Sequence, residues 1–361
     1  MSTLEPSSKR VKMSDGSSSP VIGTHNGHFH ADEALAVYLL RQLPQYQSAQ
    51  LVRTRDAERL QTCDIVVDVG AVHDHNARRY DHHQREFTAT FPGHHTKLSS
   101  AGLVWMHYGP EIIHSQTGLA VDSAENALLY EKTYTDFIEA FDGNDNGIAP
   151  YDPAALRAAG IEKKFSDKSF SLASVVNKFN FAPSDPSATS TSEKAASAEE
   201  EDARFLRASA FVGQQFAFEL SHTFHSWLPA RGVVAEAFRT RREVHPSGRV
   251  ILIPHRPEGV PWSEHLYNLE EAEGKSGEIL YAIFPESGEK DSKWRIRAVS
   301  LENGSFENRK ALPEAWRGLR DEELSTVSGV PGSVFIHASG FIGGNQTYEG
   351  VVALAGKAVE L

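Results

Sequence analysis

The sequence predicts an α/β protein with two domains: a doubly wound parallel sheet domain followed by a smaller α+β domain. Length is the first observation, because 361 residues exceed what one hydrophobic core usually holds. Second, β-branched stretches alternate with helical patterns over residues 20–182, which is typical of a parallel sheet. Third, short strands follow one another after about residue 230, which favours an α+β domain at the C-terminal end.

The expected elements of the first domain begin with a strand at 21–24, a histidine-bearing loop and a helix at 34–43 that stops before a proline. A strand at 51–54 and a helical turn at 57–61 follow. Residues 65–69 are rich in β-branched side chains, as in a parallel strand covered on both faces. Helices are then expected at 99–108, closed by Gly109 and Pro110, and at 125–141, where apolar residues recur with helical spacing.

The second half of the chain opens with a segment rich in Pro, Ser, Thr, Ala and Glu at 183–202, which predicts a flexible insertion. A long helix at 204–227, ended by Pro229, follows. The remaining pattern predicts strands at 232–238, 250–253, 278–284, 294–299 and 334–337, a glycine-rich turn, and a final helix at 348–358. The expected boundaries are a disordered tail at 1–19, an N-terminal domain at 20–182, an insertion and linker helix at 183–229, and a C-terminal domain at 230–361.

Charge and composition exclude several classes of protein. A net charge of -12 argues against a general polyanion binder. No apolar run approaches the ~18 residues that would predict a membrane span. Cys63 is the only cysteine, so no intramolecular disulfide can form, which suits a reducing, intracellular compartment. The tail segment Lys9-Arg10-Val11-Lys12 matches a short nuclear-import signal, so we expect the nucleus or cytoplasm, with the mitochondrion as an alternative.

Histidines and aspartates gather where the predicted strands of the first domain end. Nine of the 17 histidines lie between His25 and His95, and one segment reads Tyr80-Asp81-His82-His83-Gln84. Ligands at the carboxyl ends of neighbouring strands converge on one crevice, which predicts a metal centre. The expected ligands are His25, His30, Asp32, Asp68, His82 and Asp142. This set can hold two divalent metal ions; mixed imidazole and carboxylate ligands favour Mn²⁺ over Mg²⁺ and Zn²⁺.

These residues resemble the DHH phosphoesterase superfamily, and more closely one branch of it, the melanocyte-proliferating-gene (Myg) family of DHH-type exonucleases. The resemblance spans nearly the whole chain after the tail. The matching stretches are Thr24 to Gly27 with Phe29-His30 and Asp32-Glu33, Asp64 to Gly70, Tyr80 to Arg85, Phe141-Asp142 with Asp145 to Ile148, His225 to Arg231, Trp316 to Arg320, and Phe335 to Gly344.

The resemblance implies a DHH phosphoesterase domain, a linker and a smaller substrate-binding domain. It implies a divalent-metal-dependent phosphodiester hydrolase, a 3′→5′ exonuclease acting on RNA. The alternative is a hydrolase of small phosphorylated molecules such as pyrophosphate or short oligonucleotides, and a non-catalytic metal-dependent interaction protein is a third reading. In the wider superfamily two aspartates usually stand in the first motif, and here His30 replaces one, so the distribution of ligands between the metals stays open.

Carried over residue by residue, the resemblance implies that Asp81 orients a histidine and that His83 faces the substrate phosphate or the leaving group. Asp145 is the alternative to Asp142 as a ligand, while Glu33 is interpreted as a helix-start residue and His28 as an exposed loop residue or a ligand.

The C-terminal domain is expected to hold the RNA or oligonucleotide substrate. The turn at 337–344 offers backbone N–H groups and one imidazole, through His337, Gly340, Gly343 and Gly344. Arg295, Arg297, Arg317 and Arg320 are candidates for contacts to a nucleic-acid backbone. Without the resemblance, an ordinary tight turn and solvated arginines would explain these residues equally well. The oligomeric state is left open.

Overall fold

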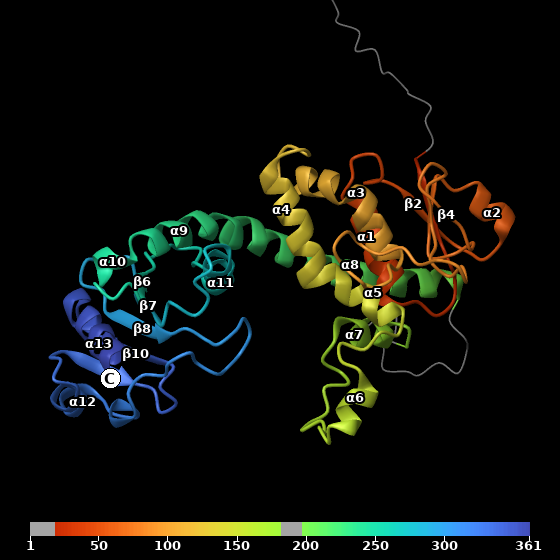
Figure 1. Ribbon diagram of the computed structural model, residues 1–361. Helices are drawn as coiled ribbons and strands as arrows, with labels where there is room; N and C mark the ends of the chain where they lie inside the picture. Colours follow the sequence, from red (N-terminus) through yellow and green to blue (C-terminus); the bar gives the residue numbers. More distant parts are fainter. Residues whose placement is uncertain (1–18, 182–196) are drawn as a thin grey trace, which may run out of the picture. The chain divides into compact units, whose positions relative to one another are not determined.

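The computed structural model describes residues 19–181 and 197–361, which fall into two units (Figure 1). The first unit ends at Ala217 and the second runs from Phe218 to Leu361. Residues 1–18 of the predicted tail and residues 183–196 of the predicted insertion lie outside the described residues. The mixed α/β class is confirmed, because each unit contains a five-stranded sheet together with helices.

The first sheet has the strand order β2-β1-β3-β5-β4. All neighbours pair in parallel except β4, which runs antiparallel to β5. Parallel strands are covered on both faces, which is why the central strand β3 consists of Ile65, Val66 and Val67, all buried. The strands are β1 (Val21–Thr24), β2 (Gln50–Arg53), β3 (Ile65–Val67), β4 (His73–Asp74) and β5 (Arg79–Tyr80).

Helices pack against this sheet and against one another in the first unit (Figure 1). Leu60 of α2 packs with Val66 of β3 and Val52 of β2, so α2 covers one face. The helices α1 and α3 pack together and contact β3 and β5, and Ser209 of α8 donates a hydrogen bond to the Ala34 carbonyl of α1. The helices are α1 (Ala31–Arg41), α2 (Ala57–Gln61), α3 (Ser100–Thr117), α4 (Ala124–Thr133), α5 (Glu139–Asp145), α6 (Pro153–Ala158), α7 (Leu172–Phe179) and α8 (Ala198–His222).

The prediction that α3 closes at Gly109 and Pro110 is wrong, because the helix continues to Thr117. Proline has no N–H, so Pro110 leaves the carbonyl four residues earlier, that of Met106, without its helical donor. The hydroxyl of Tyr130 donates to that carbonyl at 2.9 Å, which replaces the missing bond. Gly109 permits the approach, since a Cβ there would lie 2.6 Å from the Tyr130 ring.

The helix predicted at 125–141 is present but interrupted. A π turn, Tyr134–Ile138, separates α4 from α5, and α5 runs on to Asp145. A π turn adds one residue, which rotates everything after it by about 100° relative to a continuous α-helix. Asp142 therefore lies inside a helix rather than after its end, and the side chains of α5 face directions that simple helical spacing does not predict.

The second sheet has the strand order β6-β7-β8-β10-β9, in which only β6 and β7 pair in parallel. One face packs against α13 through Ile283 and Ile296, and the other packs partly against α9 and α11 through Ile251 and Ala282. The strands are β6 (Val250–Leu252), β7 (Tyr281–Pro285), β8 (Trp294–Ala298), β9 (Ser333–Ile336) and β10 (Ile342–Asn345). The helices are α9 (Leu228–Arg239), α10 (Arg241–Val244), α11 (Ser263–Ala272), α12 (Asp321–Ser328) and α13 (Tyr348–Glu360), with a π turn at Thr223–Trp227 and a 3₁₀ turn at Glu314–Trp316.

Two further predictions in this half are wrong. Residues 232–238 are helical in α9 and not a strand, because Pro229 lies in the first turn of a new helix after the π turn, where a missing N–H costs little. The predicted turn at 337–344 is shorter than expected, because residues from Ile342 onward form β10. No helix in the described ranges is long and apolar enough to cross a membrane.

Candidate metal centre

Buried histidines and carboxylates meet at the edge of the first sheet where its parallel strands end. His25 comes directly after β1, Asp68 directly after β3, and His82 two residues after β5. Asp32 and Glu33 lie in the first turn of α1, and Asp145 ends α5. Three groups of side chains there could each hold a cation, with ligand atoms within 4.8 Å of one another. They are His25, His30, Glu33 and Asp68; Asp68, His82 and His83; and Asp32, His82 and Asp145.

Asp68 joins the first two groups because its two oxygens face different histidines. Oδ2 lies 3.4 Å from Nε2 of His25, and Oδ1 lies 3.4 Å from Nε2 of His82. His25 Nε2 also lies 3.1 Å from Oε1 of Glu33, and His82 Nε2 lies 3.0 Å from Oδ2 of Asp145. A carboxylate placed in this way can bridge two cations.

The backbone at Asp68 is strained, with a φ of 56° in the left-handed region that non-glycine residues rarely adopt. Such a conformation costs on the order of 1–3 kcal/mol, and it persists only where the surrounding structure enforces it. Here it turns the carboxylate from the end of β3 toward both histidines. Strain of this kind is typical of functional sites.

The buried acids of this site perturb one another and the histidines beside them. Asp32, Glu33 and Asp68 are at most 3% exposed, and burial raises the pKa of Asp32 and Glu33. Burial alone would lower the pKa of His25, but Asp68 and Glu33 reverse this and raise it to about 10. Asp145 and Asp68 likewise overcome burial and raise the pKa of His82 to about 10. Buried negative charge in excess must be balanced by protons or by cations, and divalent cations displace such protons.

The candidate donor atoms lie close enough together to share a cation. Both ring nitrogens of His82 are buried without a hydrogen-bond partner among the described residues, although Nε2 lies close to two carboxylate oxygens. Metal–ligand bonds of about 2.1 Å place neighbouring donor atoms about 3.0–3.4 Å apart. The observed separations match that pattern, so the residues fit divalent metal ions.

Asp142, expected as a ligand, belongs to none of the three groups found in the described residues. It is fully buried and accepts hydrogen bonds from the Ser99 backbone N–H at 2.8 Å, the Ser99 hydroxyl at 2.6 Å and the Tyr134 hydroxyl at 2.9 Å. A Cβ at Gly102 would lie 2.3 Å from its oxygens, so the carboxyl fills the space above a glycine. Burial raises the pKa of Asp142 to about 7.

Ser99 connects Asp142 to Asp32, a member of the candidate ligand groups. The Ser99 hydroxyl lies 2.5 Å from Oδ1 of Asp32, and the backbone N–H groups of Ser100 and Ala101 donate to the same carboxylate at 3.1 and 2.6 Å. The start of α3 therefore orients Asp32, and Asp142 orients the start of α3. The structure places Asp145, the alternative considered from the sequence, next to His82 instead.

The Asp81 and His83 side chains form a second pair at the same edge. Asp81 Oδ1 lies 2.7 Å from His83 Nδ1, and Oδ2 accepts from the Ala71 backbone N–H at 2.5 Å. The hydrogen bond to Asp81 raises the pKa of His83, and the His83 and Ala71 donors outweigh burial in lowering the pKa of Asp81. The His83 side chain is 60% exposed, so it is the member of the motif that faces solvent.

Glu33 is a candidate ligand that sequence reasoning missed. It accepts from the His30 backbone N–H at 2.8 Å, as a helix-start residue does, yet Oε2 is buried with no hydrogen-bond partner in the described ranges. An acid at this helical position directly after two histidines was the available signal. Outside the groups, His75 stacks on His107 at 4.1 Å, and His94 lies between Glu131 and Glu139 at 3.0 and 2.9 Å.

The substrate residues expected in the second unit lie around β8 and β10. Arg295 and Gly344 are paired across these strands, and a Cβ at Gly344 would meet Arg295 Nη1 at 2.3 Å. The guanidinium groups of Arg295 and Arg320 lie 5.0 and 5.8 Å from the ring of Phe335. Arg297 is exposed and lies 6.0 Å from the Trp262 ring.

The other expected substrate residues have structural contacts. Arg317 donates to the Leu312 carbonyl at 2.9 Å and lies against Gly340, which has a φ of 74°. A Cβ at Gly343 would lie 2.2 Å from Ile336, so this glycine permits packing between strands. His337 is exposed, with Nδ1 2.9 Å from the Ser339 hydroxyl.

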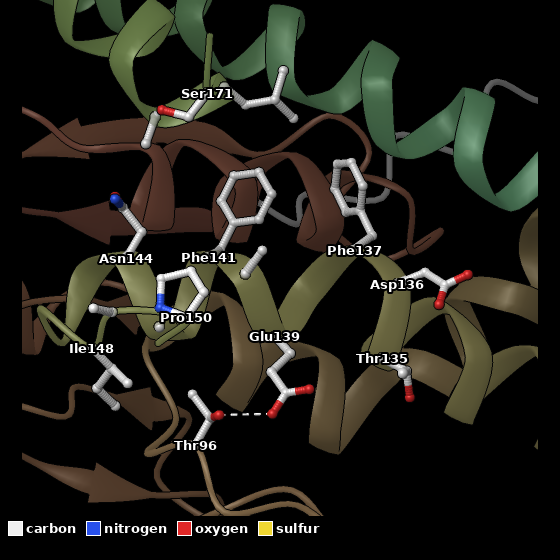
Figure 2. A pocket seen from close by; sticks show the side chains of 15 residues that line it. Thr96, Thr135, Asp136, Phe137, Glu139, Phe141, Asn144, Ile148, Pro150 and Ser171 are labelled. Carbon is white, nitrogen blue, oxygen red and sulfur yellow. Dashed lines mark hydrogen bonds between the residues drawn. The ribbon is translucent and has the colours of Figure 1, made fainter. Parts of the chain in front are cut away.

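A pocket of about 690 Å³ lies beside α5 (Figure 2). Figure 2 shows Phe137, Phe141 and Asn144 on its wall, and the hydrogen bond of 2.7 Å from Thr96 to Glu139. Its lining includes no member of the three ligand groups, so its volume gives no evidence about the metal centre.

Comparison with known proteins relates the chain to one family over almost its full length. The family model described as MYG1_exonuc, an uncharacterised protein family (UPF0160), matches residues 21–359. A Caenorhabditis elegans protein named MYG1 protein C27H6.8 is 43% identical over 348 residues, which cover 94% of this chain and 95% of that protein. A Homo sapiens protein named MYG1 exonuclease is 43% identical over 342 residues, which cover 93% of this chain and 85% of that protein. The solved structure of a pGpG-specific phosphodiesterase, PggH, from Vibrio cholerae is 11% identical, covers 94% of this chain and 98% of its own, and has a TM-score of 0.26, too low to support an argument.

Proposed function

Because the chain belongs to the MYG1_exonuc family (UPF0160), we propose that it is a divalent-metal-dependent phosphodiester hydrolase that removes nucleotides from the 3′ end of RNA. The observation that supports this most directly is the cluster of buried ligands in which Asp68 lies between His25 and His82. The human relative is named an exonuclease, which agrees with hydrolysis at the end of a nucleic acid.

Two divalent metal ions, with Mn²⁺ preferred, are the cofactors that these ligands suit. His25, His30, Glu33 and Asp68 would hold one ion. The other two groups share His82, so His82 would hold the second ion, with Asp68 or with Asp32 and Asp145. When bound, the ions would supply an activated water and would neutralise charge on the phosphoryl group. Ser99 and Asp142 keep Asp32 in place during this chemistry.

His83 is the residue that would give a proton to the departing 3′ oxygen. Asp81 accepts from its Nδ1 and raises the pKa of the ring, so the protonated form is favoured and Nε2 can donate. A departing ribose oxygen needs this proton, whereas 4-nitrophenolate does not. His83→Ala should therefore slow RNA hydrolysis much more than hydrolysis of bis(4-nitrophenyl) phosphate.

The second unit would bind the substrate backbone, as the resemblance to DHH-type exonucleases implies. Arg295 and Arg320 lie beside the ring of Phe335, and Arg297 lies beside that of Trp262; Arg295 is also ion-paired with Glu286. Phosphate and base contacts of a single strand use positive charges and aromatic rings.

The test offers purified protein with Mn²⁺ or Mg²⁺ to 5′-end-labelled RNA, to single-stranded DNA and to pyrophosphate. We expect RNA to shorten in one-nucleotide steps from its 3′ end. Asp68→Asn should lower the rate by more than about 100-fold, because direct ligands matter more than the residues that orient them. Glu86→Gln, which changes an exposed acid outside the ligand groups, is the matched control. Hydrolysis of pyrophosphate with RNA left intact would instead support a small-molecule hydrolase.

A further inference from the structure

A row of rings leads from the metal centre to the surface of the first unit. The ring centroids of His25 and His30 are 6.1 Å apart, those of His30 and His28 are 5.5 Å apart, and those of His28 and Phe181 are 5.8 Å apart. His28 and His30 are exposed, and Phe181 is 72% exposed. Phe181 lies far from the histidine loop in sequence, so only the fold brings these rings together.

Hydrogen bonds hold the loop to Asn180, the residue before Phe181. The Phe29 backbone N–H donates to Oδ1 of Asn180 at 3.0 Å, and Nδ2 of Asn180 donates to the Phe29 carbonyl at 2.9 Å. The Arg204 guanidinium donates to the Asn180 carbonyl at 2.9 Å. Phe29 itself is only 1% exposed and anchors the loop in the core. Asn180, the residue before Phe181, is therefore held by the loop at Phe29 and by Arg204 of α8.

The outer two rings of this row are those of His28 and Phe181. His28 and Phe181 belong to none of the ligand groups in the part of the chain that the structure describes. Nε2 of His28 lies 2.9 Å from Oδ1 of Asn177. This hydrogen bond orients the ring through an atom at its edge, so it does not cover the faces on which a base could stack. The interplanar angles of 58° and 55° mean that neighbouring rings do not cover one another.

Exposed aromatic rings beside a binding site are what proteins use to bind the bases of single strands. Stacking needs no positive charge and tolerates any base sequence. This suits a chain with a net charge of -12, which cannot rely on general attraction to phosphates. Arg55 adds one local cation, because its Nη2 lies 3.2 Å from Nδ1 of His25 and the residue is exposed.

We propose that His28 and Phe181 form a stacking track for the bases of a single-stranded nucleic acid whose end lies at the metal centre. This proposal rests on the proposed function. It assigns a polymer with unpaired bases as the substrate class of the candidate metal centre. The bases next to the reacting phosphodiester stack on His28 and Phe181 in turn. The inner ring, His30, remains with the metal ligands.

The experiment measures binding of a fluorescent oligouridylate of about 12 nucleotides by anisotropy, with Ca²⁺ in place of Mn²⁺ so that turnover does not interfere. Phe181→Ala should weaken binding about tenfold, in the range of one lost stacking contact, and Phe181→Trp should keep or improve it. His28→Gln keeps a donor for Asn177 and loses the ring, so it should bind about tenfold more weakly. His28→Phe keeps the ring and loses the hydrogen bond, so it should bind like the wild type.

An abasic strand of the same length is the second probe. It carries the same phosphates but no bases, so it should bind more weakly than the oligouridylate. Its affinity should be the same for the wild type and for all variants. The proposal would be wrong if all variants bound oligouridylate with the same affinity. It would also be wrong if the variants lost as much affinity for the abasic strand as for oligouridylate. Failure of the proposed function is seen separately, because the wild type would then not hydrolyse bis(4-nitrophenyl) phosphate with Mn²⁺.

Discussion

The two aspartates of α5, Asp142 and Asp145, have different surroundings. Asp145 faces His82 from a partly exposed position, whereas Asp142 is enclosed by Ser99, Tyr134 and Gly102. The first arrangement leaves oxygens available for a cation. The second uses both oxygens as hydrogen-bond acceptors. Burial outweighs these hydrogen bonds and raises the pKa of Asp142 to about 7.

Replacing these two aspartates separately distinguishes a ligand from a positioning residue. Asp145→Asn should weaken Mn²⁺ binding by about 10- to 100-fold, because an amide oxygen carries no charge for the ion. Asp142→Asn should bind Mn²⁺ almost as the wild type does, since the amide resembles the protonated carboxyl. Isothermal titration calorimetry measures both. The opposite order of affinities would show that Asp142 is the ligand after all.

His107 predicts a pH dependence of stability outside the metal centre. Burial, with the nearby His75 and His73, lowers its pKa in the folded protein to about 4. The unfolded chain has the ordinary value of about 6.5, so between these values it binds a proton that the folded protein does not. Stability should therefore fall as the pH is lowered from about 6.5 toward 4.

His107→Phe keeps an aromatic ring beside His75 and removes the titration. In urea unfolding at pH 7 and pH 5, the variant should lose less free energy of unfolding on acidification than the wild type. The comparison cancels the contributions of other groups. An equal loss in both proteins would mean that His107 titrates normally in the folded state.

At the scale of elements, interruptions in the helices decide where side chains point. The π turn Tyr134–Ile138 changes the phase of α5, and this brings Asp145 to His82 and Asp142 to Ser99. In α3, Pro110 is tolerated because the Tyr130 hydroxyl replaces the donor that proline lacks. The same contact ties α3 to α4 close to where α4 enters its π turn.

A double-mutant cycle tests this compensation. Tyr130→Phe should cost about 1 kcal/mol of stability, because the Met106 carbonyl loses its donor. In a Pro110→Ala background the new N–H can reach that carbonyl, so the same change at Tyr130 should cost much less. Thermal unfolding of the four proteins gives the coupling energy. Additive effects would show that the contribution of the Tyr130 hydroxyl does not depend on Pro110.

At the scale of the whole molecule, the candidate ligands all belong to the first unit. Ligand binding to one folded unit stabilises that unit by mass action. With Mn²⁺ at about 100 times its dissociation constant, unfolding of the first unit should cost about 2.7 kcal/mol more. Differential scanning calorimetry should then show one transition that moves upward with Mn²⁺ and returns with a chelator.

The second unit is the internal control for this measurement. Its transition should not respond to Mn²⁺, and in Asp68→Asn neither transition should respond. A metal-induced shift of both transitions would indicate that the units unfold together or that the second unit also binds the ion.

The sequence by itself determined the α/β class and predicted most of the residues that meet at the sheet edge as candidate ligands. His25 and Asp68 directly follow short apolar strands and His82 follows soon after a third, and the ends of parallel strands meet. That rule depends only on local pattern, so it can be read without a structure. Pairing of Asp81 with His83 is equally local, because the two residues are neighbours in one turn.

Only the tertiary structure decided which acid of α5 faces His82 and that Glu33 is buried beside His25. The π turn shifts helical phase through packing, which helical spacing in the sequence does not encode. Tertiary structure alone also placed Phe181 beside His28, through the hydrogen bonds of Asn180 to Phe29. Contacts across such sequence distances follow from how the elements pack, and no local pattern contains that information.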